Sequence, residues 1–158
     1  MKFVRNAWYV AGWAEDFKHS LRSITVLERN IVVYRSSQGH IVALDDRCPH
    51  KSLPLSKGQL VEDQIICGYH GLTFGNDGFC KHVPGQSSIP PSAKVHAYPT
   101  HECHEIVWIW MGDIEKADKS KIFDLSHFKD PKWIMHRGEA LHLKCNYLSV
   151  AENLIDPA

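Results

Sequence analysis

The sequence predicts a mainly β domain that is followed by a short helical segment. Short runs rich in β-branched and aromatic residues recur through the first two thirds of the 158-residue chain, and Gly-, Asn- and Asp-containing turns separate them. Two of the loops between these runs each carry one cysteine and one histidine. Near the end of the chain, residues 144–155 place apolar side chains at helical spacing before Pro157.

The predicted strands follow one another with short connections. We expect strands at residues 23–27, 31–35, 40–44, 65–66, 72–74 and 105–111. Glu28-Arg29-Asn30 would join the first two into a hairpin. The tetrapeptide Gly75-Asn76-Asp77-Gly78 predicts a tight turn, because glycine adopts positive φ without steric cost.

The composition changes after residue 113. Residues 114–131 are rich in Lys, Asp and Ser and predict a connector. Residues 133–143 alternate moderately and predict a further strand, and residues 144–155 predict a helix. We therefore expect one β domain over residues 1–113, and over 114–158 a connector with the start of a second domain.

Composition excludes several classes of protein. Lys plus Arg and Asp plus Glu both total 18, and this balance argues against nucleic acid or an anionic membrane as the main partner. No apolar run reaches transmembrane length. The apolar stretch Ala7–Trp13 is followed at once by Glu15 and Asp16 without a cleavage site, so we expect no signal peptide and a cytoplasmic location. Five cysteines, an odd number, argue against a disulfide framework.

The two cysteine- and histidine-containing loops have the spacing of a metal site. Cys48 and His50 form a C-x-H pair, and Cys67 and His70 form a C-x-x-H pair. Three interpretations are open: a [2Fe–2S] centre with two Cys on one iron and two His on the other, a Cys₂His₂ structural zinc site, and coincidence. Zinc fingers usually pair Cys with Cys and His with His, so loops of mixed composition favour the iron–sulfur centre.

Around these loops the sequence resembles the N-terminal part of a Rieske non-haem iron oxygenase. The matching segments are CPHKSLPLSKG (48–58), CGYHGLTF (67–74) and NDGFCKHVPG (76–85). The opening FVRNAWYVAGW (3–13) and the tetrapeptide YHGL resemble the vanillate O-demethylase oxygenase group. The resemblance implies a Rieske-type antiparallel β-sandwich that binds a [2Fe–2S] cluster. It also implies Cys48 and Cys67 as thiolate ligands, His50 and His70 as imidazole ligands, and a following α+β catalytic domain of which only the first strand and helix are present.

Departures from related families predict a cluster of low reduction potential. High-potential Rieske proteins carry two further cysteines that link the ligand loops, and Leu53 and Tyr69 stand at those positions here. They also place a hydroxyl near a cluster sulfur where this chain has Leu72, and fewer hydrogen bonds to sulfur disfavour the reduced state. Lys51 stands where the oxygenase family usually has Arg, which keeps the charge without bidentate geometry.

Basic side chains flank the ligand loops, and two interpretations of them are open. The residues are Arg47, Lys51, Lys57 and Lys81. They could form a docking patch for an acidic flavin or ferredoxin donor, or simply a solvated loop face.

Asp156 is a candidate catalytic residue by resemblance. In the family the matching Asp precedes two histidines that, with a distant carboxylate, hold mononuclear Fe(II). The first of these histidines would be expected directly after Ala158, so we expect the mononuclear iron only in a full-length parent. The resemblance implies that Asp156 of one subunit meets His70 of the next. The alternative is a turn-forming Asp before Pro157 at a helix end.

Two functions from different classes follow. The first, implied by the resemblance, is the oxygenase component of a multicomponent monooxygenase that hydroxylates or O-demethylates a small aromatic substrate. It would receive electrons from a flavin- or ferredoxin-type reductase, and its full-length form would be a homo-oligomer, a trimer in the family. The second is a stand-alone Rieske ferredoxin-type electron carrier. Such carriers are shorter and have no use for residues 133–158, and a zinc-stabilised domain is a more remote third.

Overall fold

The fold is described by a computed structural model for residues 3–156. Its contacts divide the chain into one compact unit up to Leu125 and a second from Ser126 on. The first unit contains ten strands and four short 3-10 turns, and the first part of the predicted connector belongs to it. The second unit contains one 3-10 turn and one helix.

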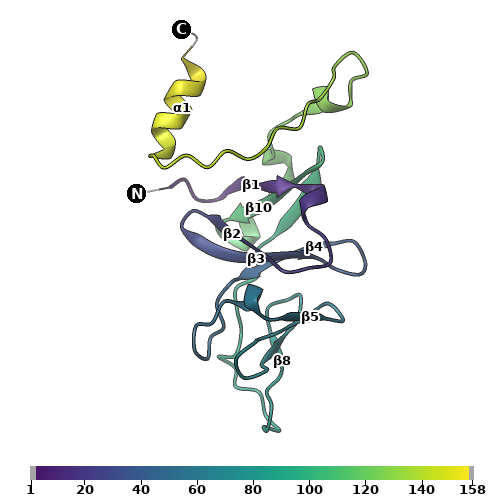
Figure 1. The fold of residues 1–158 in the computed structure, drawn as a ribbon, viewed down its shortest axis with the longest axis vertical. Coiled ribbons are helices and arrows are strands. Elements are labelled where there is room, and N and C mark those ends of the chain that lie inside the picture. Colours follow the sequence, from purple (N-terminus) through teal and green to yellow (C-terminus); the bar gives the residue numbers. More distant parts are fainter. Residues whose placement is uncertain (1–2, 157–158) are drawn as a thin grey trace. The chain divides into compact units, whose positions relative to one another are not determined.

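The strands of the first unit form three antiparallel sheets. Their bounds are β1 Ala7–Trp13, β2 Arg22–Val26, β3 Arg29–Arg35, β4 Ile41–Asp45, β5 Gln59–Val61, β6 Gln64–Ile66, β7 Thr73–Phe74, β8 Cys80–His82, β9 Thr100–Cys103 and β10 Ile106–Met111. The sheet orders are β1-β10-β9, β2-β3-β4 and β5-β6-β7-β8. The mainly β, antiparallel fold predicted from the sequence is confirmed (Figure 1).

The sheet β2-β3-β4 is the middle layer, and β3 explains why. Val32 and Tyr34 face one hydrophobic core, which also holds Phe74 of the sheet β5-β6-β7-β8. Ile31 and Val33 face a second core shared with β1 and β10. The side chains of these four consecutive residues are fully buried. Successive residues of a strand point to opposite faces, and here both faces of the strand are covered.

Most of the predicted strands are present, but the first hairpin differs in register. The turn is Leu27-Glu28, with φ of 49° and 62°, and β3 already begins at Arg29. Two residues in the left-handed region make the tight hairpin turn whose twist matches that of paired strands. The connection Glu28-Arg29-Asn30 expected from the sequence is therefore wrong. The turn of residues 75–78 is confirmed, since the Gly78 N–H donates to the Gly75 carbonyl at 2.9 Å.

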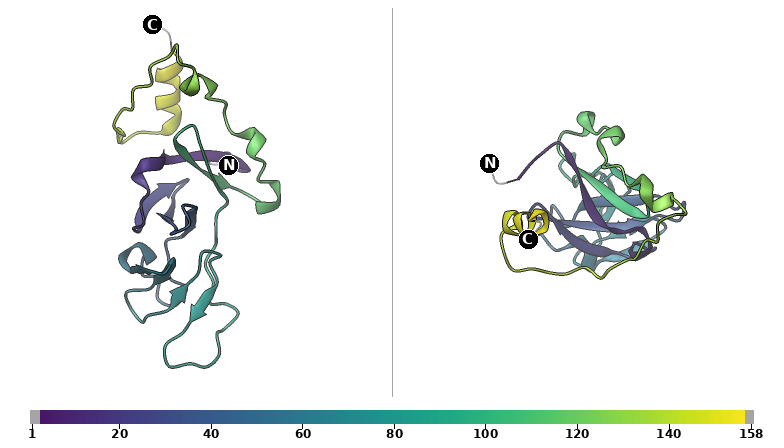
Figure 2. Two further views of the ribbon diagram at one scale, coloured as in Figure 1. Left: turned by 90° about the vertical axis from the view of Figure 1, so that its right-hand side faces the viewer. Right: turned by 90° about the horizontal axis from the view of Figure 1, so that it is seen from above.

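Strand β1 is the apolar stretch Ala7–Trp13, where no strand is predicted from the sequence. It runs beside β10 (Figure 2) and pairs with it. In this pairing Trp8 lies opposite Trp110. Their indole N–H groups donate to the carbonyls of Asp118 and Asp113 at 2.8 and 2.9 Å. The first part of the connector therefore packs on the tryptophan-bearing side of this sheet.

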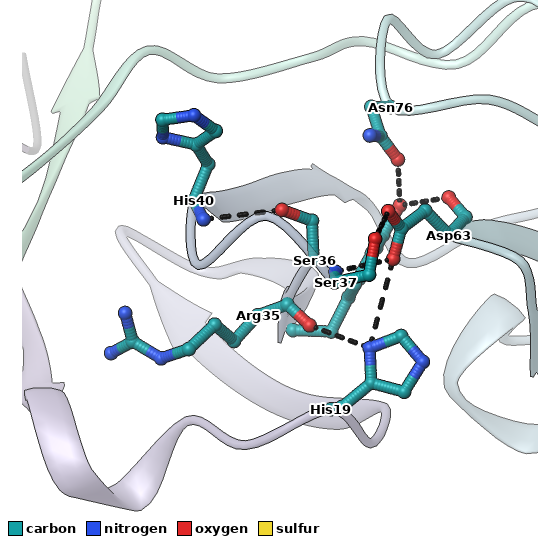
Figure 3. Close-up of polar contacts among 8 residues, drawn as sticks. His19, Arg35, Ser36, Ser37, His40, Asp63 and Asn76 are labelled. Carbon is teal, nitrogen blue, oxygen red and sulfur yellow. Dashed lines mark hydrogen bonds and ion pairs between the residues drawn. The ribbon is translucent and has the colours of Figure 1, made fainter.

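A polar network ties the turn between β5 and β6 to the turn after β3 (Figure 3). The Asp63 carboxylate accepts the Ser37 backbone N–H at 2.7 Å and the Ser37 hydroxyl at 2.6 Å. The Tyr34 hydroxyl lies 2.6 Å from Asn76 Oδ1 and 2.9 Å from the Asp63 carbonyl oxygen, so its single proton is shared between these two acceptors. The hydrogen bonds from Ser37 hold the pKa of the Asp63 carboxyl below its usual value. His19, whose Nδ1 lies 3.6 Å from Asp63 Oδ1, lowers this pKa further. These contacts fix the sheet β5-β6-β7-β8 on the middle layer.

The second unit contains the predicted helix but not the predicted strand. Helix α1 spans Tyr147–Ile155, and the Asn146 side chain caps it by accepting the Leu148 N–H at 3.0 Å. Residues 133–143 have no strand partner among residues 3–156, and the strand expected there is wrong. Most of their apolar side chains, including Ile134 and Leu141, are exposed, and a strand needs an edge to pair with.

No helix within residues 3–156 is long and apolar enough to cross a membrane.

Two glycines with similar backbone conformation offer a test of the packing in the first unit. Gly78 has φ of +77°, and a Cβ there would lie 2.3 Å from the Val95 carbonyl oxygen. Gly39 has φ of +85°, and a Cβ there would meet nothing within 4 Å. We expect Gly39→Ala to lower the free energy of unfolding by about 1 kcal/mol, the cost of the left-handed conformation. We expect Gly78→Ala to lower it by about 3 kcal/mol, because overpacking is added. Urea denaturation measures both, and equal losses would contradict the close approach at Gly78.

Candidate iron–sulfur centre

The first ligand loop connects β4 to the 3-10 turn η2 (Leu55–Lys57). The Cys48 N–H donates to the Leu53 carbonyl at 2.9 Å, and the Ser52 N–H donates to the Cys48 carbonyl at 2.9 Å. Ser52 adopts the left-handed conformation with φ of 60°, and its hydroxyl accepts the Arg47 Nε–H at 2.9 Å. The backbone thus closes this loop on itself around Cys48.

The second ligand loop, between β6 and β7, repeats this arrangement. The Cys67 N–H donates to the Leu72 carbonyl at 2.8 Å, and the Gly71 N–H donates to the Cys67 carbonyl at 3.0 Å. Gly71 has φ of 75° and occupies the position that Ser52 has in the first loop. Both cysteines therefore bond to residues four and five positions further on, and one backbone geometry presents both side chains.

The four predicted ligands separate into a thiol pair and an imidazole pair. Cys48 and Cys67 are 2% and 3% exposed, whereas His50 and His70 are exposed. The ring centroids of His50 and His70 lie 4.7 Å apart with the planes at 60°. The Tyr69 ring stacks on His70 with the centroids 3.8 Å apart. The structure thus brings together all four side chains that the sequence singled out.

Burial and backbone N–H groups act in opposite directions on the pKa of the Cys48 thiol. Burial raises the pKa of the Cys48 thiol, and the adjacent Cys67 side chain raises it further. Backbone N–H groups of His50 and Lys51 point at the Cys48 sulfur and act in the opposite direction. Two buried thiolates are costly on their own, and metal ions bound between them would remove this cost.

The four candidate ligands line one small space between the two loops. Lys51, Leu53, Tyr69 and Leu72 complete its lining. Within residues 3–156 no three His, Cys, Asp or Glu side chains gather around a position for one metal ion. Two pairs of donors fit a group with two metal atoms, with sulfur ligands on one and nitrogen ligands on the other.

A tight backbone contact joins the two loops. A Cβ on Gly58, which follows η2, would lie 2.2 Å from the Ile66 carbonyl oxygen, and a Cβ on Gly68 would lie 3.0 Å from that of Lys57. Ile66 and Gly68 flank Cys67 in the sequence. The end of the first loop therefore packs directly against the backbone that carries the second cysteine.

The two imidazoles also line a groove beside the ligand loops. Residues 83–93 contribute much of its wall, with Val83, Pro84 and Pro90 among the lining residues. His50 and His70 thus have one side towards the thiols and another towards an accessible, largely apolar surface.

The basic side chains around the loops are exposed, but two of them have partners. Arg47 bonds to Ser52, and Lys81 forms an ion pair with Asp77 at 2.6 Å. All five cysteines are free, and Leu72 brings no hydroxyl to the site.

Asp156 lies in the second unit, at the end of helix α1. It is exposed, and its backbone N–H donates to the Glu152 carbonyl at 3.0 Å, so it is the C-cap residue of the helix. The contact expected between Asp156 and His70 would involve two different chains, and it stays a prediction.

Sequence reasoning missed one residue close to the ligands. Asp46 is 5% exposed and bonds to Ser23 and to Ser56, which lies in the turn after the first loop. Its position two residues before Cys48 was the only signal in the sequence.

Comparisons with known proteins agree with this geometry. The toluene-4-sulfonate monooxygenase system iron-sulfur subunit of Comamonas testosteroni is 41% identical over 155 residues, 98% of this chain and 44% of that protein. The vanillate O-demethylase oxygenase subunit of a Pseudomonas species is 34% identical over 154 residues, 98% of this chain and 43% of that protein. The chain thus spans less than half the length of these relatives.

Solved structures of oxygenases are also similar to this chain. Dicamba monooxygenase bound to dicamba matches with a TM-score of 0.91 and 39% identity, over 99% of this chain and 47% of that one. The carbazole-bound oxygenase in the ferredoxin complex of carbazole 1,9a-dioxygenase matches with a TM-score of 0.63 and 29% identity, over 69% of this chain and 29% of that one. The family model of the Rieske [2Fe-2S] domain matches residues 7–99. This match includes both ligand loops, and the chain belongs to the Rieske [2Fe–2S] domain family.

Proposed function

We propose that this chain holds a [2Fe–2S] cluster, with Cys48 and Cys67 on one iron and His50 and His70 on the other. The observation that carries the proposal is the separation of the donors. Two loops with one backbone geometry present two buried thiols side by side and two exposed imidazoles 4.7 Å apart. When bound, such a cluster takes up and releases one electron at a time.

The protein's own groups determine where electrons enter and how strongly they are held. The thiols lie in the hydrophobic core with Leu72, so the sulfur side of the site is shielded from water. The imidazoles lie at the surface beside the groove, so the histidine side is the side that a partner can approach. With Leu72 in place of a hydroxyl and no disulfide between the loops, the site supports a low reduction potential.

For the whole protein we propose the oxygenase component of a multicomponent monooxygenase. Similarity to the toluene-4-sulfonate and vanillate enzymes extends over 98% of the chain, including residues beyond the Rieske match. A stand-alone carrier would not need this second part, and the similarity there favours the oxygenase. The mononuclear Fe(II) that activates O₂ would be bound by residues outside this chain.

The partners follow from the same proposal. The electron donor would be a flavin- or ferredoxin-type reductase, as the ferredoxin complex of a similar oxygenase suggests. The substrate would be a small aromatic compound, the class to which the substrates named for the relatives belong. The full-length protein would be a homo-oligomer, a trimer, in which Asp156 of one subunit meets His70 of the next. A cytoplasmic location stays a prediction.

Anaerobic purification of the chain tests the proposal directly. We expect about two irons and two acid-labile sulfides per chain, visible absorption, and a paramagnetic resonance after reduction with dithionite. A colourless protein with one bound zinc and no sulfide would contradict the proposed cluster and favour the structural zinc site.

A further inference from the structure

Asp46 is a buried carboxylate that the proposed electron transfer does not use. It is 5% exposed and lies two residues before Cys48. Ser23 Oγ donates to Asp46 Oδ2 at 2.7 Å. The Ser56 backbone N–H donates to Oδ1 and the Ser56 hydroxyl to Oδ2, both at 2.7 Å. Three donors thus surround the two carboxylate oxygens, one at Oδ1 and two at Oδ2.

The described basic side chains do not pair with Asp46. Among the side chains that the structure describes in residues 3–128 and 130–156, no Lys, Arg or His lies within ion-pair distance of this carboxylate. Arg47, its neighbour in the sequence, bonds instead to Ser52. The serines that hold Asp46 are neutral, so they stabilise the carboxylate without cancelling its charge.

This charge lies close to both ligand loops. Two residues of chain span at most about 7 Å, so Asp46 and Cys48 are neighbours in space as well as in sequence. Ser56 belongs to η2, and Gly58 directly after it packs against the Ile66 carbonyl beside Cys67. The carboxylate thus anchors the turn that separates the two cysteines, and its charge is fixed at that place.

We infer that Asp46 is a positioning residue that also lowers the reduction potential of the cluster by its fixed negative charge. The inference rests on the proposed function, because it requires a cluster in the site. Reduction adds an electron, and a buried negative charge nearby opposes that addition. One charge about 10 Å away at an effective dielectric constant of about 20 changes the equilibrium constant for reduction roughly tenfold. For a one-electron couple, a tenfold change is about 59 mV.

Asp46→Asn removes the negative charge but can keep the hydrogen bonds to Ser23 and Ser56. The amide oxygen can accept the Ser56 N–H, and the amide nitrogen can donate to the hydroxyls of Ser23 and Ser56, which rotate to accept. The network keeps its shape while the charge is lost. We expect the midpoint potential of the cluster to rise by about 59 mV, the equivalent of the tenfold change, with cluster content unchanged.

Two changes at Ser23 complete the experiment. Ser23 is exposed on β2, so both variants keep the core intact. Ser23→Lys places a cation against Asp46 and should raise the potential in the same direction, even if the Asn variant were to lose its cluster. Ser23→Ala removes one hydrogen bond but leaves the charge, and its potential should equal that of the wild type.

Redox titration of the four chains, followed by electron paramagnetic resonance, gives the result. Potentials higher in Asp46→Asn and Ser23→Lys but unchanged in Ser23→Ala support the inference. Equal potentials in all four chains overturn it, and so does a shift in Ser23→Ala as large as that in Asp46→Asn. Iron and sulfide content of the wild-type chain tests the proposed function separately, so the two failures are distinguishable.

Discussion

Cys67→Ala should leave the purified chain colourless, with iron content below about a tenth of the wild-type value. In the proposed cluster, Cys48 and Cys67 are the two protein ligands of one iron, and His50 and His70 are those of the other. With one sulfur ligand removed, the remaining three donors cannot complete two metal sites. Iron analysis, sulfide analysis and the visible spectrum of anaerobically purified protein measure the loss.

Cys80→Ala is the matched control for this experiment. Cys80 is a buried thiol in the same hydrophobic core as Cys48 and Cys67, and its sulfur contacts the His82 carbonyl at 3.2 Å. The change in volume is the same, but no proposed ligand is lost. We expect full cluster content in this variant. Equal cluster loss in both variants would mean that core packing, rather than ligation, explains the effect of Cys67→Ala.

Gly58→Ala should lower the free energy of unfolding by about 3 kcal/mol and reduce cluster content together with it. The new Cβ would lie 2.2 Å from the Ile66 carbonyl oxygen and 3.0 Å from that of Leu55. Both neighbours are backbone atoms, so no side chain can rotate away to make room. Relief requires a shift of the segment that carries Cys67, and this shift separates the two thiols. Urea denaturation and iron content measure the two effects.

Gly138→Ala provides the comparison, because a Cβ there would meet nothing within 4 Å. We expect its free energy of unfolding to lie within about 0.5 kcal/mol of the wild-type value and its iron content to be unchanged. If Gly58→Ala behaves like Gly138→Ala, the contact between the two ligand loops is looser than the structure indicates.

The sequence alone was sufficient for the family, the antiparallel β class and the four proposed ligands. Ligand identity is a local property, because C-x-H and C-x-x-H each place two donors on one short loop. The same holds for the turn of residues 75–78, where glycine is needed for a positive φ. Strand β10 was predictable for a similar reason, since a run of buried branched and aromatic residues has few other uses.

Other features depended on contacts between distant residues. Residues 133–143 have the alternation of a strand, but residues 3–156 offer no edge to pair with, so no strand forms there. Strand β1 was missed because it forms only by pairing with β10, almost a hundred residues later.

The sequence by itself determined the set of proposed donor atoms. Each loop carries its cysteine and its histidine within four consecutive residues, so residue type and spacing can be read directly from the sequence. Only the tertiary structure decided how the donors separate, with the thiols in the core and the imidazoles at the surface. Only the tertiary structure brought the Asp46 carboxylate, two residues before Cys48, into contact with serines from β2 and η2. The physical reason is that burial and electrostatic environment are set by segments that the folded chain brings together, and no single segment encodes them.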